Sequence, residues 1–86
     1  MSDDFDSAVE RVKRLKQTPA IGELLELYAF YKQGTVGDCQ GKRPGMLDFR
    51  GRAKFDAWAE VKGLPREDAR QRYVDLVLQL EKRQGE

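Results

Sequence analysis

Apolar residues recur at helical spacing in four stretches of the chain, which are separated by segments rich in glycine, proline and polar residues. The first stretch has apolar residues three or four positions apart, at Phe5, Ala8, Val9, Val12 and Leu15. Acidic residues gather at its start and basic residues at its end, an order that the helix dipole favours. This pattern predicts a first helix, which ends before Thr18 and Pro19.

The second stretch is apolar over more than half of the helix circumference, at Leu24, Leu25, Leu27, Tyr28, Phe30 and Tyr31. We expect Thr18 to cap this helix and Pro19 to occupy its first position. Its apolar surface is wider than packing against one neighbour requires. The surplus face therefore needs a ligand or a partner.

Glycines and Pro44 interrupt the periodicity from Gly34 to Gly51, which predicts a long surface loop. Loops of this length are uncommon in compact domains and often have a function. After the loop, Asp48 can cap a third helix that is closed by Gly63. The fourth stretch predicts a helix of about five turns, with Pro65 as its first residue.

Four predicted helices and no strand pattern indicate an all-α fold, a small helix bundle. The 86 residues are enough for one hydrophobic core, so we predict a single domain spanning 1–86. The single Cys39 excludes an internal disulfide and fits a reducing compartment, most simply the cytoplasm. No apolar run reaches the ~20 residues that span a bilayer, and the acidic start lacks the features of a signal peptide.

Composition also limits the chemistry. The chain has no histidine, no cysteine next to a base and no nucleophile motif, so we predict no catalytic residues, no metal site and no cofactor. A net charge of +1 argues against a general nucleic-acid binder. Five cations nevertheless lie near one another against the single anion Asp48, namely Lys42, Arg43, Arg50, Arg52 and Lys54. Such a local positive field suits a small anionic ligand.

Tyr28, Tyr31 and Lys32 are three or four positions apart and share one face of the second helix. Tyrosines at such positions, Tyr73 included, commonly serve packing alone. Their grouping with lysines favours a binding role, because tyrosine stacks on purine rings and lysine forms charge-assisted hydrogen bonds with phosphate. Lys54 lies close to Arg50 along the chain and extends the basic part. We interpret these residues as a site for a phosphorylated ligand with an apolar portion.

Two motifs resemble the acyl-CoA-binding protein family: YxxYKQxTVGD at 28–38 and RPGMLDFxGxAKxDAW at 43–58. The resemblance runs from Phe5 to about Gln84. It implies a four-helix up-down-down-up bundle that acts as a non-catalytic intracellular carrier. Such a carrier binds long-chain and medium-chain fatty acyl-CoA, and buffers, protects and transports it.

The resemblance also assigns roles to individual residues. It places the 3′-phosphate and adenine contacts on Tyr28, Tyr31, Lys32, Lys54 and Tyr73. Two basic positions near the CoA moiety fall on Lys13 and Arg50. The lining of the acyl chain falls on Val9, Leu24, Leu25 and Ala53.

Two other functions remain as alternatives. One is a helical interaction or signalling module whose apolar groove binds an amphipathic partner helix. The other is acyl-CoA hydrolysis, which the absence of a catalytic set argues against. We expect a cytoplasmic monomer with fatty acyl-CoA as its ligand, transient contacts with acyl-CoA-using enzymes or membranes, and no nucleic-acid partner.

Overall fold

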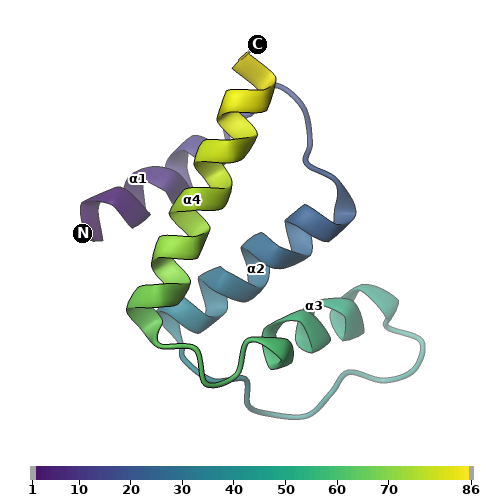
Figure 1. Ribbon diagram of the computed structural model, residues 1–86. Coiled ribbons are helices and arrows are strands. Elements are labelled where there is room, and N and C mark those ends of the chain that lie inside the picture. The colour runs from purple at the N-terminus through teal and green to yellow at the C-terminus, as the bar shows by residue number, and fades with distance from the viewer. Residues whose placement is uncertain (1, 86) are drawn as a thin grey trace.

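The computed structural model describes residues 2–85, with side chains from Asp4 onward. Its elements are α1 (Ser2–Val12), α2 (Ile21–Thr35), α3 (Phe49–Glu60) and α4 (Arg66–Gly85), and the described residues form no strand (Figure 1). The prediction of an all-α fold is confirmed. The molecule is flat, with extents of 39 × 27 × 16 Å. No helix in the described part combines the length and apolarity needed to cross a membrane.

Helices α1 and α4 run parallel to each other. The ring of Phe5 packs against Tyr73 with 5.2 Å between centroids. About two helical turns further on, Nε of Arg11 donates to Oε2 of Glu81 at 2.8 Å. Residue numbers rise together along the two helices, so both point in the same direction.

Helices α2 and α3 are also parallel. The ammonium group of Lys54 lies over the ring of Tyr28, and that of Lys32 lies over the ring of Trp58. By contrast, α2 and α4 are antiparallel, because contacts join the end of α2 to the start of α4 and its start to the end of α4. These directions give the predicted up-down-down-up topology.

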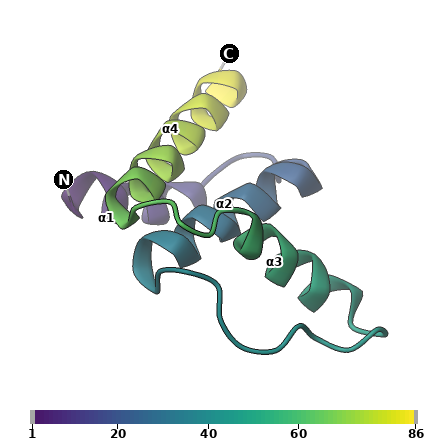
Figure 2. The same ribbon diagram turned by 60° about the horizontal axis from the view of Figure 1, so that its bottom comes forward.

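The parallel pair explains the long connection between α2 and α3. A chain that leaves the end of α2 must return along the whole helix before α3 can start in the same direction. Figure 2 shows this return along the edge of the molecule. The irregular segment is 36–48, shorter than predicted, because both Gly34 and Gly51 lie inside helices.

The core lies among α1, α2 and α4. Its buried members are Phe5, Ala8, Leu27, Tyr73, Val74, Val77 and Leu80. Helix α3 has one buried residue, Trp58, and it packs on α2. One side of α2 thus belongs to the core, and another is available to form a surface with α3.

The boundaries of the helices correct three sequence predictions. Helix α2 begins at Ile21 after Ala20, so neither Thr18 as cap nor Pro19 as first residue is right. Glu23 does the capping, because its Oε1 accepts the N–H of Ala20 at 3.1 Å. Pro65 precedes α4 and accepts the N–H of Ala69 through its carbonyl, which is the N-cap position.

Three other predicted boundaries are confirmed or refined. Asp48 caps α3 as predicted, since its Oδ1 accepts the N–H of Gly51 at 2.9 Å. Helix α1 ends at Val12, and Leu15 follows in a turn, its N–H directed to the carbonyl of Val12. Gly63 lies beyond the end of α3 and has a φ of 91°, which glycine adopts without strain.

Gly34 permits the close approach of α2 to α4. A Cβ at this position would lie 2.8 Å from Cγ of Arg70. We predict that Gly34→Ala lowers the free energy of unfolding by about 1–2 kcal/mol, because overpacking outweighs the gain in helix propensity. Gly22→Ala is the matched control in the same helix, with no atom within 4 Å of its Cβ. It should raise stability by up to ~1 kcal/mol. Urea unfolding measures both, and equal effects would contradict the packing argument.

Candidate functional site

Two lysine–aromatic pairs join α2 to α3. Nζ of Lys54 lies 5.4 Å from the centroid of the Tyr28 ring, and Nζ of Lys32 lies 4.8 Å from that of Trp58. We call these four residues the cation–aromatic face. Each pair takes one member from each helix, so the face exists only when α3 is packed on α2. Neither lysine forms an ion pair with a carboxylate in the described part of the chain.

Trp58 fixes one half of this face. Its ring is buried, and its Nε1 donates to the carbonyl of Gly37 at 2.8 Å. A ring held in this way gives Lys32 a constant surface, and the cation–π contact favours an ammonium directed over it. Sequence analysis did not include Trp58 among the candidate binding residues. Its contact with Lys32 joins residues 26 positions apart, as does that of Lys54 with Tyr28, and no local pattern in the sequence indicates it.

The other two predicted tyrosines form a cluster with Phe5. The ring of Tyr31 stacks on Phe5 at 6.0 Å and lies 6.2 Å from the ring of Tyr73. Tyr31 is exposed, whereas only 5% of Tyr73 is accessible, so Tyr73 can offer a ligand no more than a small part of its side chain. Burial, and to a lesser degree the neighbouring Tyr31, raises the pKa of Tyr73, which keeps its hydroxyl protonated.

The basic cluster is smaller than the sequence predicted. Arg43 forms two hydrogen bonds with Asp56, from Nε at 3.0 Å and from Nη2 at 2.7 Å. This ion pair lowers the pKa of the Asp56 carboxyl, chiefly through the hydrogen bonds from Arg43. Nε of Arg52 donates to the carbonyl of Pro44 at 2.9 Å. The count of five cations against one anion holds for residues 42–54, but Asp56, just beyond that segment, neutralises Arg43.

Two further predicted cations, Arg50 and Lys13, are not part of the cation–aromatic face. Arg50 is exposed in the first turn of α3 and makes no ion pair with a described carboxylate. Lys13 follows α1, where its Nζ lies 3.2 Å from Oε2 of Glu10. This exposed pair is weak and can exchange for a phosphate contact at little cost.

The four residues predicted to line the acyl chain have different environments. Leu25 and Ala53 both line a cleft of about 360 Å³ between α2 and α3, whereas Val9 and Leu24 do not. Val9 is half-buried against the core, and Leu24 is exposed. On α2, Leu24 lies on the same helical face as Tyr28, four positions away. Leu25 lies between that face and the side of α2 that lines the cleft.

The loop behind the site is anchored by Asp38. Its Oδ1 accepts hydrogen bonds from Nε2 of Gln33 and from the N–H of Gly63, both at 2.8 Å. These bonds, first that of Gln33, lower the pKa of the Asp38 carboxyl. Gln33 is buried and also donates to the carbonyl of Leu64. The network joins the end of α2 to the connection between α3 and α4, which holds α3 in place.

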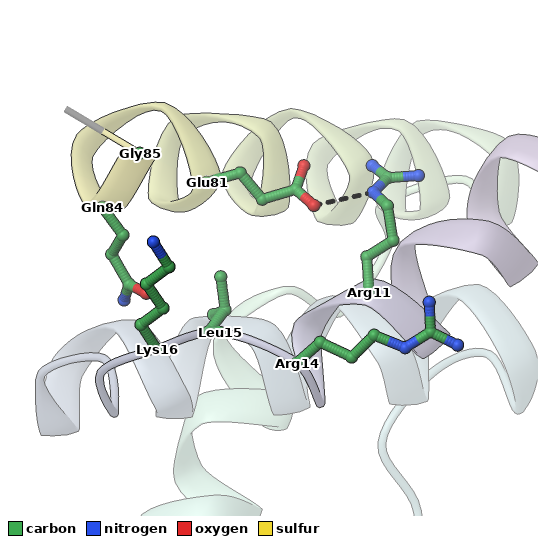
Figure 3. Close-up of a pocket in the computed structure, with 7 residues that line it drawn as sticks. All are labelled: Arg11, Arg14, Leu15, Lys16, Glu81, Gln84 and Gly85. Carbon is green, nitrogen blue, oxygen red and sulfur yellow. Dashed lines mark hydrogen bonds and ion pairs between the residues drawn. The ribbon is translucent and has the colours of Figure 1, made fainter.

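A separate cleft of about 280 Å³ lies between α1 and α4, and none of the predicted site residues lines it (Figure 3). Arg11 spans it to reach Glu81. Gln84 forms two hydrogen bonds with the backbone of Gln17, at 2.7 and 3.0 Å. Arg11, Glu81 and Gln84, which line this cleft, are thus already engaged in bonds that join α1 and the segment after it to the end of α4. Among the described side chains, no group of histidine, cysteine and carboxylate residues could hold a metal ion.

Comparison with known proteins identifies the family to which this fold and these motifs belong. Residues 2–77 match the family model described as Acyl CoA binding protein. The chain belongs to the acyl-CoA-binding protein family. It is 52% identical over 80 residues to acyl-CoA-binding protein homolog 1 of Caenorhabditis elegans, an alignment that covers 93% of each chain.

The fold agrees with this assignment. The crystal structure of acyl-CoA-binding protein 2 of Oryza sativa superposes with a TM-score of 0.94 at 35% identity, covering 99% of this chain and 92% of that one. The crystal structure of the acyl-CoA-binding protein of Moniliophthora perniciosa superposes with a TM-score of 0.93 at 41% identity, covering 100% of this chain and 85% of that one. Membership identifies acyl-CoA as the ligand of a carrier that is not an enzyme and needs no cofactor, as the sequence predicted. The contacts of individual residues with the ligand stay predictions.

Proposed function

We propose that the whole chain, 1–86, is a single carrier domain for long-chain and medium-chain fatty acyl-CoA, and that it buffers, protects and delivers these esters. The observation that carries the proposal is the cation–aromatic face. In this face two lysines lie over aromatic rings, and neither lysine has a carboxylate partner among the described residues. The chain that carries it belongs to the acyl-CoA-binding protein family. Lysines form charge-assisted hydrogen bonds with phosphate groups, and aromatic rings stack on a purine.

The nucleotide end of the ligand is assigned to the surface around this face. Lys32 and Lys54 bind the 3′-phosphate, and Tyr28 and Tyr31 contact the adenine. Tyr73 adds a contact through its small accessible part. Lys13 and Arg50 stand further out, where they attract the other phosphates. The support for this assignment is geometric: the two lysines come from different helices and meet over one surface.

The acyl end is assigned to apolar residues at the starts of α2 and α3. Leu24, Leu25 and Ala53 contact the chain, with Val9 of α1 behind them. Burial of the acyl chain contributes about 0.8 kcal/mol per methylene, so a chain of about fifteen methylenes supplies ~12 kcal/mol before the costs of association. Both ends of the ligand are therefore needed for tight binding.

The same proposal covers the setting of the protein. We place it in the cytoplasm as a monomer, where it makes transient contacts with acyl-CoA-using enzymes or with membranes. Its single Cys39 is compatible with a reducing compartment. Sedimentation velocity with and without ligand tests the monomer, and fluorescence microscopy of the tagged full chain tests the compartment.

The experiment that tests the proposed site compares palmitoyl-CoA with its 3′-dephospho analogue. We expect the analogue to bind about 10- to 100-fold more weakly, because charge-assisted hydrogen bonds are worth about 1.5–3 kcal/mol. Isothermal titration calorimetry measures both. An amphipathic-helix module, the alternative from sequence, has no use for the 3′-phosphate. Equal affinities would remove the assignment of Lys32 and Lys54 to that group.

A further inference from the structure

Two clefts lie between α1 and α4. One, of about 320 Å³, lies where the two helices begin, and the other, of about 280 Å³, lies where they end (Figure 3). Phe5 and Val74 give the first an apolar floor, and Leu15 adds an apolar side chain to the second. None of the residues assigned to acyl-CoA lines either cleft. We call this surface, with its two clefts, the α1–α4 seam.

The cleft at the helix starts is acidic. Its charged lining consists of three carboxylates and one cation, Asp4, Glu67, Asp68 and Arg70. Nε of Arg70 already donates to the carbonyl of Gly34 at 2.8 Å. All three carboxylates are exposed, and none forms an ion pair with a described residue. This cleft therefore presents negative charge beside an apolar floor.

The cleft at the helix ends is basic. Its charged lining consists of three cations and one carboxylate, Arg11, Arg14, Lys16 and Glu81. Glu81 is engaged by Arg11 at 2.8 Å. Arg14 and Lys16 are exposed and have no carboxylate partner among the described residues. Figure 3 shows both on the α1 side of the cleft.

Leu78 lies between the two clefts and is 51% exposed. Val74, four positions before it on α4, lines the acidic cleft, and Glu81, three positions after it, lines the basic cleft. The three residues therefore share one face of α4. The helix dipole accounts for acids at helix starts and bases at helix ends. It does not account for an exposed leucine on the same face, between two clefts of opposite charge.

We propose that the α1–α4 seam docks an amphipathic helix of a partner protein, which has acidic residues near one end, apolar residues in the middle and basic residues near the other end. The acidic end of that helix pairs with Arg14 and Lys16, and its middle covers Leu78. Its basic end pairs with the carboxylates of the acidic cleft. Glu67 and Glu81, one in each cleft, are 14 positions apart on α4. A helix of about four turns, ~21 Å long, spans that separation.

The charges of the seam decide between possible partners. A nucleic acid or an anionic membrane laid along it would be repelled by the three unpaired carboxylates of the acidic cleft. A protein helix with charges of both signs complements both clefts, and this complementarity selects the partner. A contact of this size is transient. If acyl-CoA binds as in the proposed function, the docked helix touches none of its assigned residues, so the loaded carrier binds the partner as well.

Fluorescence anisotropy with a labelled synthetic helix tests the docking. The probe is a peptide of about 18 residues, with glutamates in its first turns, leucines along one face of its middle and lysines in its last turns. The control peptide has the same composition, but its glutamates and lysines alternate along the chain. We expect the full chain to bind the probe about tenfold or more tightly than the control peptide. The affinity for the probe should fall with added salt.

Three variants of the full chain accompany the titration. Leu78→Ser should weaken probe binding about fivefold or more, because it removes the apolar contact in the middle of the seam. Arg14→Glu should weaken it about threefold or more, because an attraction becomes a repulsion. Leu47→Ser is the matched control, since Leu47 is also exposed but precedes α3. It should change the affinity by less than about twofold.

Palmitoyl-CoA separates docking from the proposed function. At saturation it should leave the affinity for the probe within about twofold of that of the free protein. Failure of palmitoyl-CoA to bind would contradict the proposed function and leave the peptide result standing. Displacement of the probe by palmitoyl-CoA would place the peptide in the ligand site and overturn the docking proposal.

Three further results would overturn it. The first is equal binding of the probe and the control peptide, or no binding of either. The second is wild-type affinity of Leu78→Ser for the probe. The third is a dimer in sedimentation velocity that Leu78→Ser dissociates, which would assign the seam to a second copy of this chain.

Discussion

The affinity for acyl-CoA is expected to rise by about four orders of magnitude between octanoyl-CoA and palmitoyl-CoA. Each methylene that leaves water contributes about 0.8 kcal/mol, so two added carbons strengthen binding about tenfold. The increase continues only while new methylenes find apolar surface. Leu24, Leu25 and Ala53 are the residues assigned to this surface, and none of them is fully buried in the free protein.

Calorimetric titration with even-numbered esters from octanoyl to stearoyl measures this dependence. The length at which affinity stops rising gives the reach of the acyl site. Free CoA is the control for the nucleotide end alone. An affinity that stays flat from short to long chains would contradict the assignment of an apolar lining, whatever the strength of the nucleotide contacts.

Lys32→Ala is expected to weaken palmitoyl-CoA binding by about 10- to 100-fold. The substitution removes an ammonium that has no carboxylate partner in the described chain and that the ring of Trp58 holds in place. Charge-assisted hydrogen bonds of this kind contribute about 1.5–3 kcal/mol. The binding of the 3′-dephospho ester should change much less, because its 3′-phosphate is already missing.

Two controls accompany this variant. Lys82→Ala removes an exposed lysine from the last turn of α4 and should leave the affinity within about twofold of the wild type. Urea unfolding shows whether Lys32→Ala retains the stability of the fold. A stable Lys32→Ala protein with wild-type affinity would exclude Lys32 from the phosphate site.

Helical periodicity was sufficient to predict the four helices but not their directions. The up-down-down-up order came from the resemblance, and the structure gives its reason in the contacts of Tyr28 with Lys54 and of Lys32 with Trp58. Local sequence carries no signal for contacts between residues this far apart. The cap of α2 was missed for a different, local reason: Ala20 has no capping side chain, and Glu23, three residues later, accepts the hydrogen bond of the Ala20 N–H instead.

The grouping of candidate site residues was predictable where they share one helix. Tyr28, Tyr31 and Lys32 are three or four positions apart, so their common face follows from helix geometry. The basic cluster was overestimated because counting charges in a window cannot show that Arg43 bonds Asp56 outside that window. The exposed state of Leu47, just before α3, and of Phe49, its first residue, was also beyond sequence, because apolar residues at the start of a helix are usually expected to pack inward.

The central claim is that this chain carries intact fatty acyl-CoA, with one site for both ends of the ester. The measurement that tests it most directly is calorimetric titration with palmitoyl-CoA, with free CoA and palmitate as controls. We predict tight one-to-one binding of the ester, much weaker binding of either part, and no thioester cleavage during the titration. Absence of binding by the ester, or equal binding of palmitate alone, would contradict the claim.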